Sequence, residues 1–188
     1  MEIIYSAHGA ETNEIREYVR FLSPNRSFYQ DENMYSPMIL LSYQGKGILL
    51  TGDANIENET EVINSIYNID VDVLKLAHHG SKYSTSAEFL EFTTPDYAII
   101  SCGDNTSGHP HSEVMNRIKN HSLELYNNTY STYEKNNIIC HVSNNEVHMI
   151  FVDDINSYVF VNYYLIAIGI MGICLIVVFF PRYKKDKE

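Results

Sequence analysis

Short apolar runs alternate along this chain with segments whose apolar residues recur at helical spacing. The apolar runs predict strands at residues 38–43, 47–51, 71–77, 96–102, 137–142 and 146–152. The helical spacing predicts helices at residues 10–20, 57–68 and 109–121, and a short helix that begins after Thr85 or Ser86. Because strands alternate with helices through the middle of the chain, the pattern predicts an α/β fold.

Polar residues follow three of these predicted strands. Asp53 comes after 47–51, His78 and His79 come after 71–77, and His109 lies in the loop after 96–102. Ligands gather at strand ends in α/β folds, so these residues are candidates for a site. Each of these residues also has a purely structural interpretation. Asp53 could belong to a turn or cap a helix, the histidine pair could form a polar turn, and His109 could lie on an exposed loop.

The apolar segment 159–180, VFVNYYLIAIGIMGICLIVVFF, contains no charged residue. As a helix it would span roughly 30 Å, the thickness of a bilayer core, and a basic tail follows it. This predicts a transmembrane helix over 158–181, a cytoplasmic tail at 182–188, and a globular extracytoplasmic part over 1–157. The alternative is a buried core helix.

The first residues, MEIIYSAHGAETNE, have neither the basic region nor the apolar region of a signal peptide. A globular part outside the cytoplasm needs an export signal. We therefore expect that an N-terminal portion carrying this signal is missing from the sequence.

The composition limits the kind of partner more than it identifies one. The 188 residues carry a formal net charge of −11, which opposes binding of nucleic acid by general electrostatics. A nuclease remains compatible with this charge, because bound metal ions supply local positive charge. The three cysteines have no zinc-like spacing.

Three motifs, LLTGDAN, AHHGS and SGHPHSEV, occur in this order with strands and helices between them. In order and spacing they resemble the C-terminal half of the metallo-β-lactamase fold, in particular that of ComEC-type competence proteins, from about Leu22 to Ile150. The resemblance implies a partial αββα sandwich, here followed by the transmembrane helix. It also implies metal-dependent hydrolysis of a phosphodiester, with nucleic acid or another phosphodiester as substrate.

The resemblance also implies roles for individual residues. Asp53 matches a carboxylate that bridges two metal ions, zinc or manganese, and the pair His78 and His79 matches a motif that supplies one ligand. Which of the two histidines binds metal stays open. His109 matches a motif near the substrate or leaving group. Carboxylate and imidazole are suitable ligands for such ions, which activate water.

One large part of the family pattern is missing. Its H-x-H-x-D-H motif, which supplies most other ligands, has no counterpart here, and His8 is the only histidine before Asp53. We therefore expect a truncated, membrane-anchored hydrolase with an incomplete site and an N-terminal half of the fold as partner. The alternative is a non-catalytic membrane-anchored module that needs such a partner or has lost activity. A sortase-anchored surface protein is disfavoured, because no L-P-x-T-G-like segment precedes the apolar run.

Overall fold

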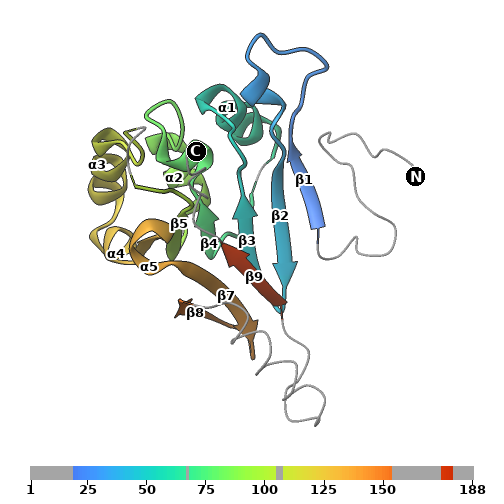
Figure 1. The fold of residues 1–188 in the computed structure, drawn as a ribbon. Coiled ribbons are helices and arrows are strands. Elements are labelled where there is room, and N and C mark those ends of the chain that lie inside the picture. The colour runs from blue at the N-terminus through green and yellow to red at the C-terminus, as the bar shows by residue number, and fades with distance from the viewer. Residues whose placement is uncertain (1–18, 67, 105–107, 154–174, 180–188) are drawn as a thin grey trace, which may run out of the picture.

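A six-stranded sheet forms the centre of the computed structural model, which describes residues 19–66, 68–104 and 108–153 and the backbone of 175–179 (Figure 1). Its strands, in spatial order, are β1 (Val19–Ser23), β2 (Met38–Tyr43), β3 (Lys46–Leu50), β4 (Val73–Lys75), β5 (Tyr97–Ile100) and β6 (Thr129–Ser131). β1, β2 and β3 pair antiparallel, whereas β3 to β6 pair parallel. The carboxyl ends of β3 to β6 therefore lie along one edge of the sheet.

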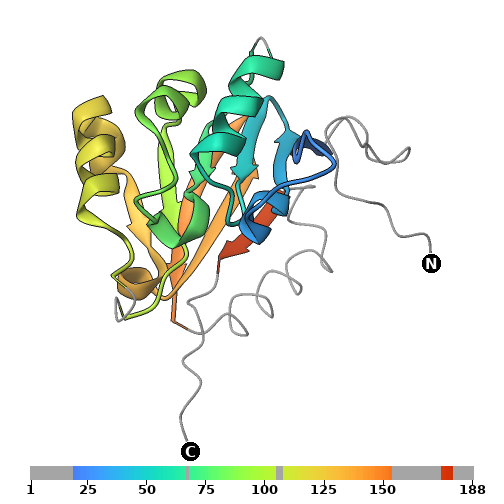
Figure 2. The ribbon, with the colours of Figure 1, turned by 90° about the horizontal axis from the view of Figure 1, so that it is seen from above.

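Helices cover one face of this sheet (Figure 2). The α-helices are α1 (Ile56–Ser65), α2 (Ala87–Thr93), α3 (Ser112–His121), α4 (Leu123–Asn127) and α5 (Thr132–Lys135), and the two 3-10 turns are η1 (Glu32–Tyr35) and η2 (Ala77–Gly80). α1 to α4 bury apolar side chains against Leu49, Leu74 and Ala98 of the sheet. Burying a Leu or Ile side chain contributes about 1.5–3 kcal/mol, so this layer holds the helices in place.

A second, antiparallel sheet covers the opposite face. Its spatial order is β8 (Glu146–Val152), β7 (Asn137–Ser143) and β9 (Leu175–Phe179). Ile48, Val73 and Ile99 of the central sheet pack against Ile138, Cys140 and Val142 of β7. Neighbouring strand residues thus face opposite layers, as the two-residue period of a strand requires. The described layers, helix–sheet–sheet, agree with part of the αββα sandwich that the sequence predicts.

Most elements between residues 38 and 152 agree with the sequence prediction. The strands β2, β3, β7 and β8 and the helices α1, α2 and α3 lie where it expected them, and Ser86 caps α2. The short elements α4, β6 and α5 were not predicted. The helix expected over 10–20 is wrong at Val19 and Arg20, which pair with Leu41 and Leu40 in the sheet, and its remainder lies outside the described residues.

The C-terminal apolar segment gives a mixed outcome. Leu175–Phe179 forms a strand that pairs with β7, where the sequence predicted part of a transmembrane helix. Short runs of Ile and Val suit an extended backbone as well as a helix, which explains the difference. The rest of the predicted span and the tail lie outside the described residues. Among the described residues, no helix is long and apolar enough to cross a membrane.

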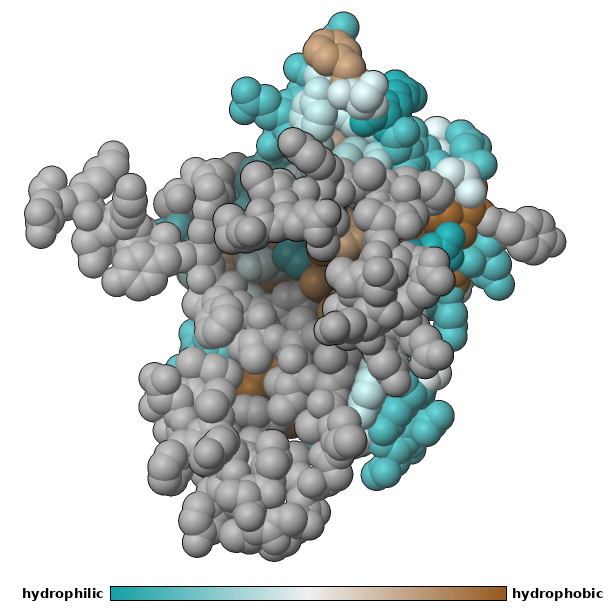
Figure 3. Space-filling view, turned by 90° about the vertical axis from the view of Figure 1, so that its right-hand side faces the viewer, coloured by the Kyte–Doolittle hydropathy of each residue, from teal (hydrophilic) through white to brown (hydrophobic). Residues whose placement is uncertain are grey.

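Figure 3 shows the molecule from the side of β1. The described residues visible at the end that carries η1 and α1 are mostly hydrophilic, with small separate hydrophobic areas. Phe28, in the loop before η1, is the most exposed large apolar side chain among the described residues, at 72%. Single exposed apolar residues of this kind are common on soluble surfaces.

Candidate functional site

Three consecutive parallel strands bring polar residues to one edge of the central sheet. Leu50, Lys75 and Ile99 are neighbours in register at the ends of β3, β4 and β5. The segments that follow them therefore start side by side. They carry Asp53 after β3, the histidine pair after β4, and Ser101 after β5.

The histidine pair lies in a tight turn. Both residues have left-handed backbone angles, with φ of 48° at His78 and 55° at His79. Histidine is one of the residues that adopt this conformation more often than most. The backbone N–H of His78 donates to the carbonyl oxygen of Gly52 at 3.0 Å, which ties the turn to the segment that carries Asp53.

His79 faces Asp53 from a fixed orientation. Its Nδ1 lies 2.5 Å from the carbonyl oxygen of Ser101, so Nδ1 carries the proton and donates it to that oxygen. In the neutral ring this leaves the lone pair on Nε2, which lies 3.9 Å from Oδ1 of Asp53. That distance is too long for a hydrogen bond. Two electron-pair donors thus face each other across a short gap.

The GHPH loop lies directly against the histidine turn. Gly80 has φ of +80°, and a Cβ there would lie 2.8 Å from the Cβ of Pro110. The backbone N–H of His111 donates to the carbonyl oxygen of Gly80 at 2.9 Å. The centre of the His109 ring consequently lies 5.7 Å from that of His78, 6.5 Å from that of His79 and 5.0 Å from that of His111.

A lysine lies below this cluster, at the end of β4. Burial lowers the pKa of Lys75, and the negative charge of Asp53 partly opposes that effect. The ammonium group lies 3.4 Å from the carbonyl oxygen of Leu76. Lys75 and Asp53 are therefore close enough to interact electrostatically.

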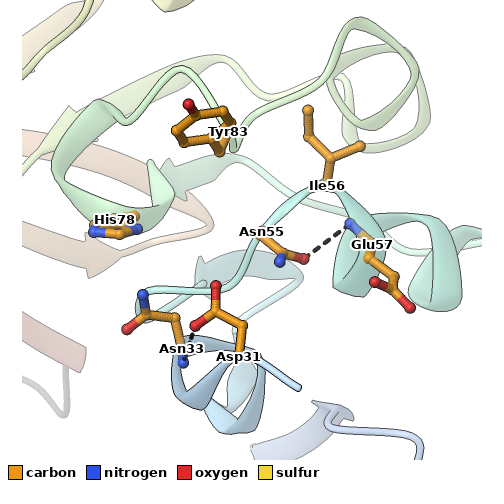
Figure 4. A pocket seen from close by; sticks show the side chains of 7 residues that line it. All are labelled: Asp31, Asn33, Asn55, Ile56, Glu57, His78 and Tyr83. Atoms are coloured by element: carbon orange, nitrogen blue, oxygen red, sulfur yellow. Dashed lines mark hydrogen bonds between the residues drawn. The ribbon is translucent and has the colours of Figure 1, made fainter. Parts of the chain in front are cut away.

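A cavity of about 430 Å³ adjoins His78 (Figure 4). In the close-up Tyr83 lies on one side of it and Asp31 and Asn33 lie on the opposite side. The remaining lining residues are Asn55, Ile56 and Glu57, from the start of α1. The first turn of η1 and the first turn of α1 therefore form one wall of the site.

Asn58 holds η1 against α1. Its side-chain amide donates to the carbonyl oxygen of Met34 at 2.9 Å, and its Oδ1 accepts from the backbone N–H of Asn55 in a capping box. Ser36, just after η1, also lies against Gly52, where an added Cβ would be 3.0 Å from its Cβ. These contacts fix the wall next to the segment that carries Asp53.

The structure brings together all four residues that the sequence singled out, Asp53, His78, His79 and His109. Within the described residues, however, no group of three or more His, Cys, Asp or Glu side chains is arranged to hold a metal ion. The sequence did not single out Tyr83, Asn33 or Asn55 as site residues. Their convergence depends on tertiary contacts between separate segments, which the three sequence motifs do not include.

Comparisons with known proteins agree with this geometry. Residues 15–104 match the model of the metallo-beta-lactamase superfamily. ComE operon protein 3 of Bacillus subtilis (strain 168) is 41% identical over 105 residues, which are 55% of this chain and 14% of that protein. Recombination protein 2 of Haemophilus influenzae is 37% identical over 115 residues, which are 61% of this chain and 14% of that protein.

Competence protein ComA of Neisseria gonorrhoeae is 35% identical over 107 residues, which are 56% of this chain and 16% of that protein. The chain thus matches only about a seventh of the length of each of these relatives. The matched part includes the Asp53 and His78–His79 segments, which lie within residues 15–104. This chain therefore carries a ComEC-type metallo-β-lactamase-fold domain.

Proposed function

We propose that this chain is a subunit or part of a metal-dependent hydrolase that cleaves a phosphodiester. The observation that carries the proposal is the placement of Asp53 Oδ1 3.9 Å from His79 Nε2, with the Nδ1 proton of His79 donated to the Ser101 carbonyl. A backbone carbonyl that fixes the tautomer of a histidine is typical of the surroundings of metal-binding imidazoles. The superfamily match and the similarity to proteins named for competence and recombination support the same proposal.

The donor set suits part of a metal site. Zinc binds imidazole nitrogen and carboxylate oxygen at about 2.0–2.2 Å, so two such ligands of one ion lie at most about 4.3 Å apart. Asp53 and His79 meet this limit. The carboxylate of Asp53 has two oxygens, so it could bind one or two ions. In this proposal His79, rather than His78, is the ligand of the pair. Zinc or manganese, when bound, activates water and polarises the phosphate.

The chain's own residues then have distinct tasks. The Ser101 carbonyl keeps the lone pair of His79 directed toward Asp53, and Lys75 lies close enough to that carboxylate to interact with it electrostatically. His109 lies beside the pair, with its ring centre 6.5 Å from that of His79. From there it contacts the substrate or gives a proton to the leaving group. Further ligands must come from outside the described residues, such as an H-x-H-x-D-H segment of a partner half.

A second candidate, a non-catalytic module, is favoured by one observation. The described residues supply a pair of facing donors but no group of three metal-binding side chains. A catalytic zinc usually has three protein ligands. A module that keeps the fold and binds a partner without holding metal would have this arrangement.

Metal analysis of the purified full chain separates the two candidates. The chain, alone and co-expressed with a segment that carries the H-x-H-x-D-H motif, is equilibrated with zinc or manganese, and bound metal and hydrolysis of bis(p-nitrophenyl) phosphate are measured. We expect the combined form to bind metal and hydrolyse the ester, and Asp53→Ala and His79→Ala to abolish both. The exposed His148→Ala is the control. If no form of the protein binds metal, the hydrolase proposal is contradicted and the non-catalytic module is supported.

We also propose that the C-terminal apolar segment associates the protein with a membrane, with the globular part outside the cytoplasm. The charge-free run of residues 159–180 and the basic residues after it support this. Pairing of Leu175–Phe179 with β7 and insertion of the same residues into a bilayer exclude each other. Sedimentation of the full chain with liposomes, compared with a chain that ends at residue 157, tests the proposal. Equal sedimentation of the two would contradict it.

A further inference from the structure

The cavity beside His78 has no role in the proposed metal chemistry. Its volume of about 430 Å³ falls in the range of sites that bind small molecules, roughly 300–1,000 Å³. His78 belongs to both places, since it lines the cavity and its ring centre lies 6.3 Å from that of His79. The two places are therefore close enough for neighbouring groups of one ligand to occupy both.

An exposed aromatic ring forms one side of the cavity. Tyr83 is 66% exposed, although its backbone is well fixed. Its N–H donates to Oγ of Ser81 at 3.3 Å, and its carbonyl oxygen accepts from the backbone N–H of Ile56 at 3.0 Å. The ammonium group of Lys82 lies over the ring, 5.1 Å from its centre. The ring is thus a solvent-accessible stacking surface on a fixed backbone, with a cation over one of its faces.

The opposite side offers hydrogen-bonding groups and not positive charge. Asp31 and Asn33 come from η1 and its cap, and Asn55 caps α1. Glu57 is ion-paired with Arg26 at 2.7 Å, whereas Asp31 uses one oxygen to accept from the backbone N–H of Asn33 at 2.9 Å. Carboxylate oxygens repel a phosphate but accept hydrogen bonds from ring amino groups, and an asparagine amide can both donate and accept.

We propose that this cavity binds the base of an unpaired nucleotide whose phosphodiester lies at Asp53 and His79. The base stacks on Tyr83, and Asp31 and Asn33 bind its edge. A paired base has its edge occupied by its complement and its faces covered by neighbours, so the cavity selects a single-stranded end. The adjacency of base and scissile phosphate rests on the proposed function, whereas the binding of the base itself does not need a metal.

Binding without metal tests the cavity separately from hydrolysis. In the presence of a chelator, the full chain is titrated with a 5′-phosphorylated deoxyadenosine dinucleotide and with the same compound whose terminal base has been removed. We expect the compound with both bases to bind at least about 5-fold more tightly, since one stacked base contributes about 1–3 kcal/mol. Equal affinities for the two compounds would overturn the proposal, whatever the outcome of the metal experiments.

Matched variants assign the effect to the ring. Tyr83→Ala is expected to weaken binding of the intact dinucleotide about 5- to 100-fold and to leave binding of the abasic compound unchanged. Tyr83→Phe keeps the stacking surface and should stay within about 2-fold of the unsubstituted chain. Phe28→Ala removes another exposed ring that does not line the cavity, and should change nothing. Loss of binding in Phe28→Ala, or none in Tyr83→Ala, would contradict the assignment.

Discussion

Gly80 and Pro110 are in such close contact that the histidine turn accepts no side chain at residue 80. A Cβ on Gly80 would lie 2.8 Å from Cβ and 3.1 Å from Cα of Pro110. The φ of +80° independently favours glycine. This contact, together with the hydrogen bond from His111 to the Gly80 carbonyl, holds His109 beside the histidine pair.

Gly80→Ala should therefore lower the free energy of unfolding by about 2–4 kcal/mol, since left-handed strain costs about 1–2 kcal/mol and overpacking about 1–3 kcal/mol. Urea denaturation measures the change. Gly45→Ala is the matched control, because Gly45 has φ of +70° but an added Cβ would meet only Asn145 Nδ2, at 3.7 Å. If both substitutions cost the same, the contact with Pro110 is not limiting.

Glu59→Ala should destabilise the segment that carries Tyr83. The buried carboxylate of Glu59, on α1, accepts from the backbone N–H groups of Thr85 and Ser86, the latter at 2.8 Å. Removing it leaves two buried donors without an acceptor, at about 1–3 kcal/mol each. We expect a loss of about 2–4 kcal/mol in urea denaturation, against less than about 0.5 kcal/mol for the exposed Glu88→Ala. A similar small loss in both would show that water replaces the carboxylate.

Lys46→Met should remove the part of the free energy of unfolding that depends on the protonation of Lys46 at high pH. Lys46 Nζ lies 2.6 Å from Oδ1 of Asp72, and this hydrogen bond raises the pKa of Lys46. A raised lysine pKa means that the stabilisation is complete below the usual lysine value, near 10.4, and is lost as the pH rises through the folded value. The variant should lose about 1–2 kcal/mol at pH 8, and the difference from the unsubstituted chain should shrink above pH ~10.5.

Lys119→Met, at an exposed position of α3, is the control for this experiment. Asp72→Ala should cost more than Lys46→Met, because Oδ2 of Asp72 also accepts from the backbone N–H of Gly47 at 2.7 Å. If Asp72→Ala and Lys46→Met lower the free energy of unfolding by the same amount, the hydrogen bond from Gly47 contributes nothing measurable.

His141 should make the second sheet sensitive to acid. Burial lowers the pKa of His141, and the neighbouring His148 on β8 lowers it further. A lowered histidine pKa means that stability is complete above the usual value near 6.5 and falls as the pH drops through the folded value. Thermal unfolding between about pH 5 and pH 7 should show this slope, and His141→Phe should remove most of it.

His148→Gln separates the two causes of this effect. It removes the neighbouring positive charge but leaves the burial of His141, which is the larger cause. Most of the pH dependence should therefore persist in His148→Gln. A variant whose stability no longer varies with pH would assign the effect to the pair of histidines and not to burial.

The sequence pattern predicts elements where local spacing and tertiary packing agree. The apolar runs of β2 and β3 and the helical faces of α1 and α3 lie in the two cores, so the pattern was correct there. α4, β6 and α5 contain only three to five residues each, too few for a period to be recognised. At Val19 and Arg20, pairing with β2 overrides a helical pattern that had no caps of its own.

The candidate site is predictable to a similar extent. Asp53, His78, His79 and His109 follow strands, and strand order alone predicts that they meet. The walls of the cavity are not predictable in this way, because Asn33, Asn55 and Tyr83 come from segments that tertiary contacts such as those of Asn58 bring together.

The acceptor that orients His79 is a main-chain oxygen, and this affects how far the site can tolerate change. Any residue type at position 101 supplies the same carbonyl, so substitutions there should leave the tautomer of His79 intact while the end of β5 keeps its path. The constraint falls on the register between β4 and β5, where Lys75 pairs with Ile99. A one-residue slip of that pairing would remove the acceptor without altering a single side chain of the site.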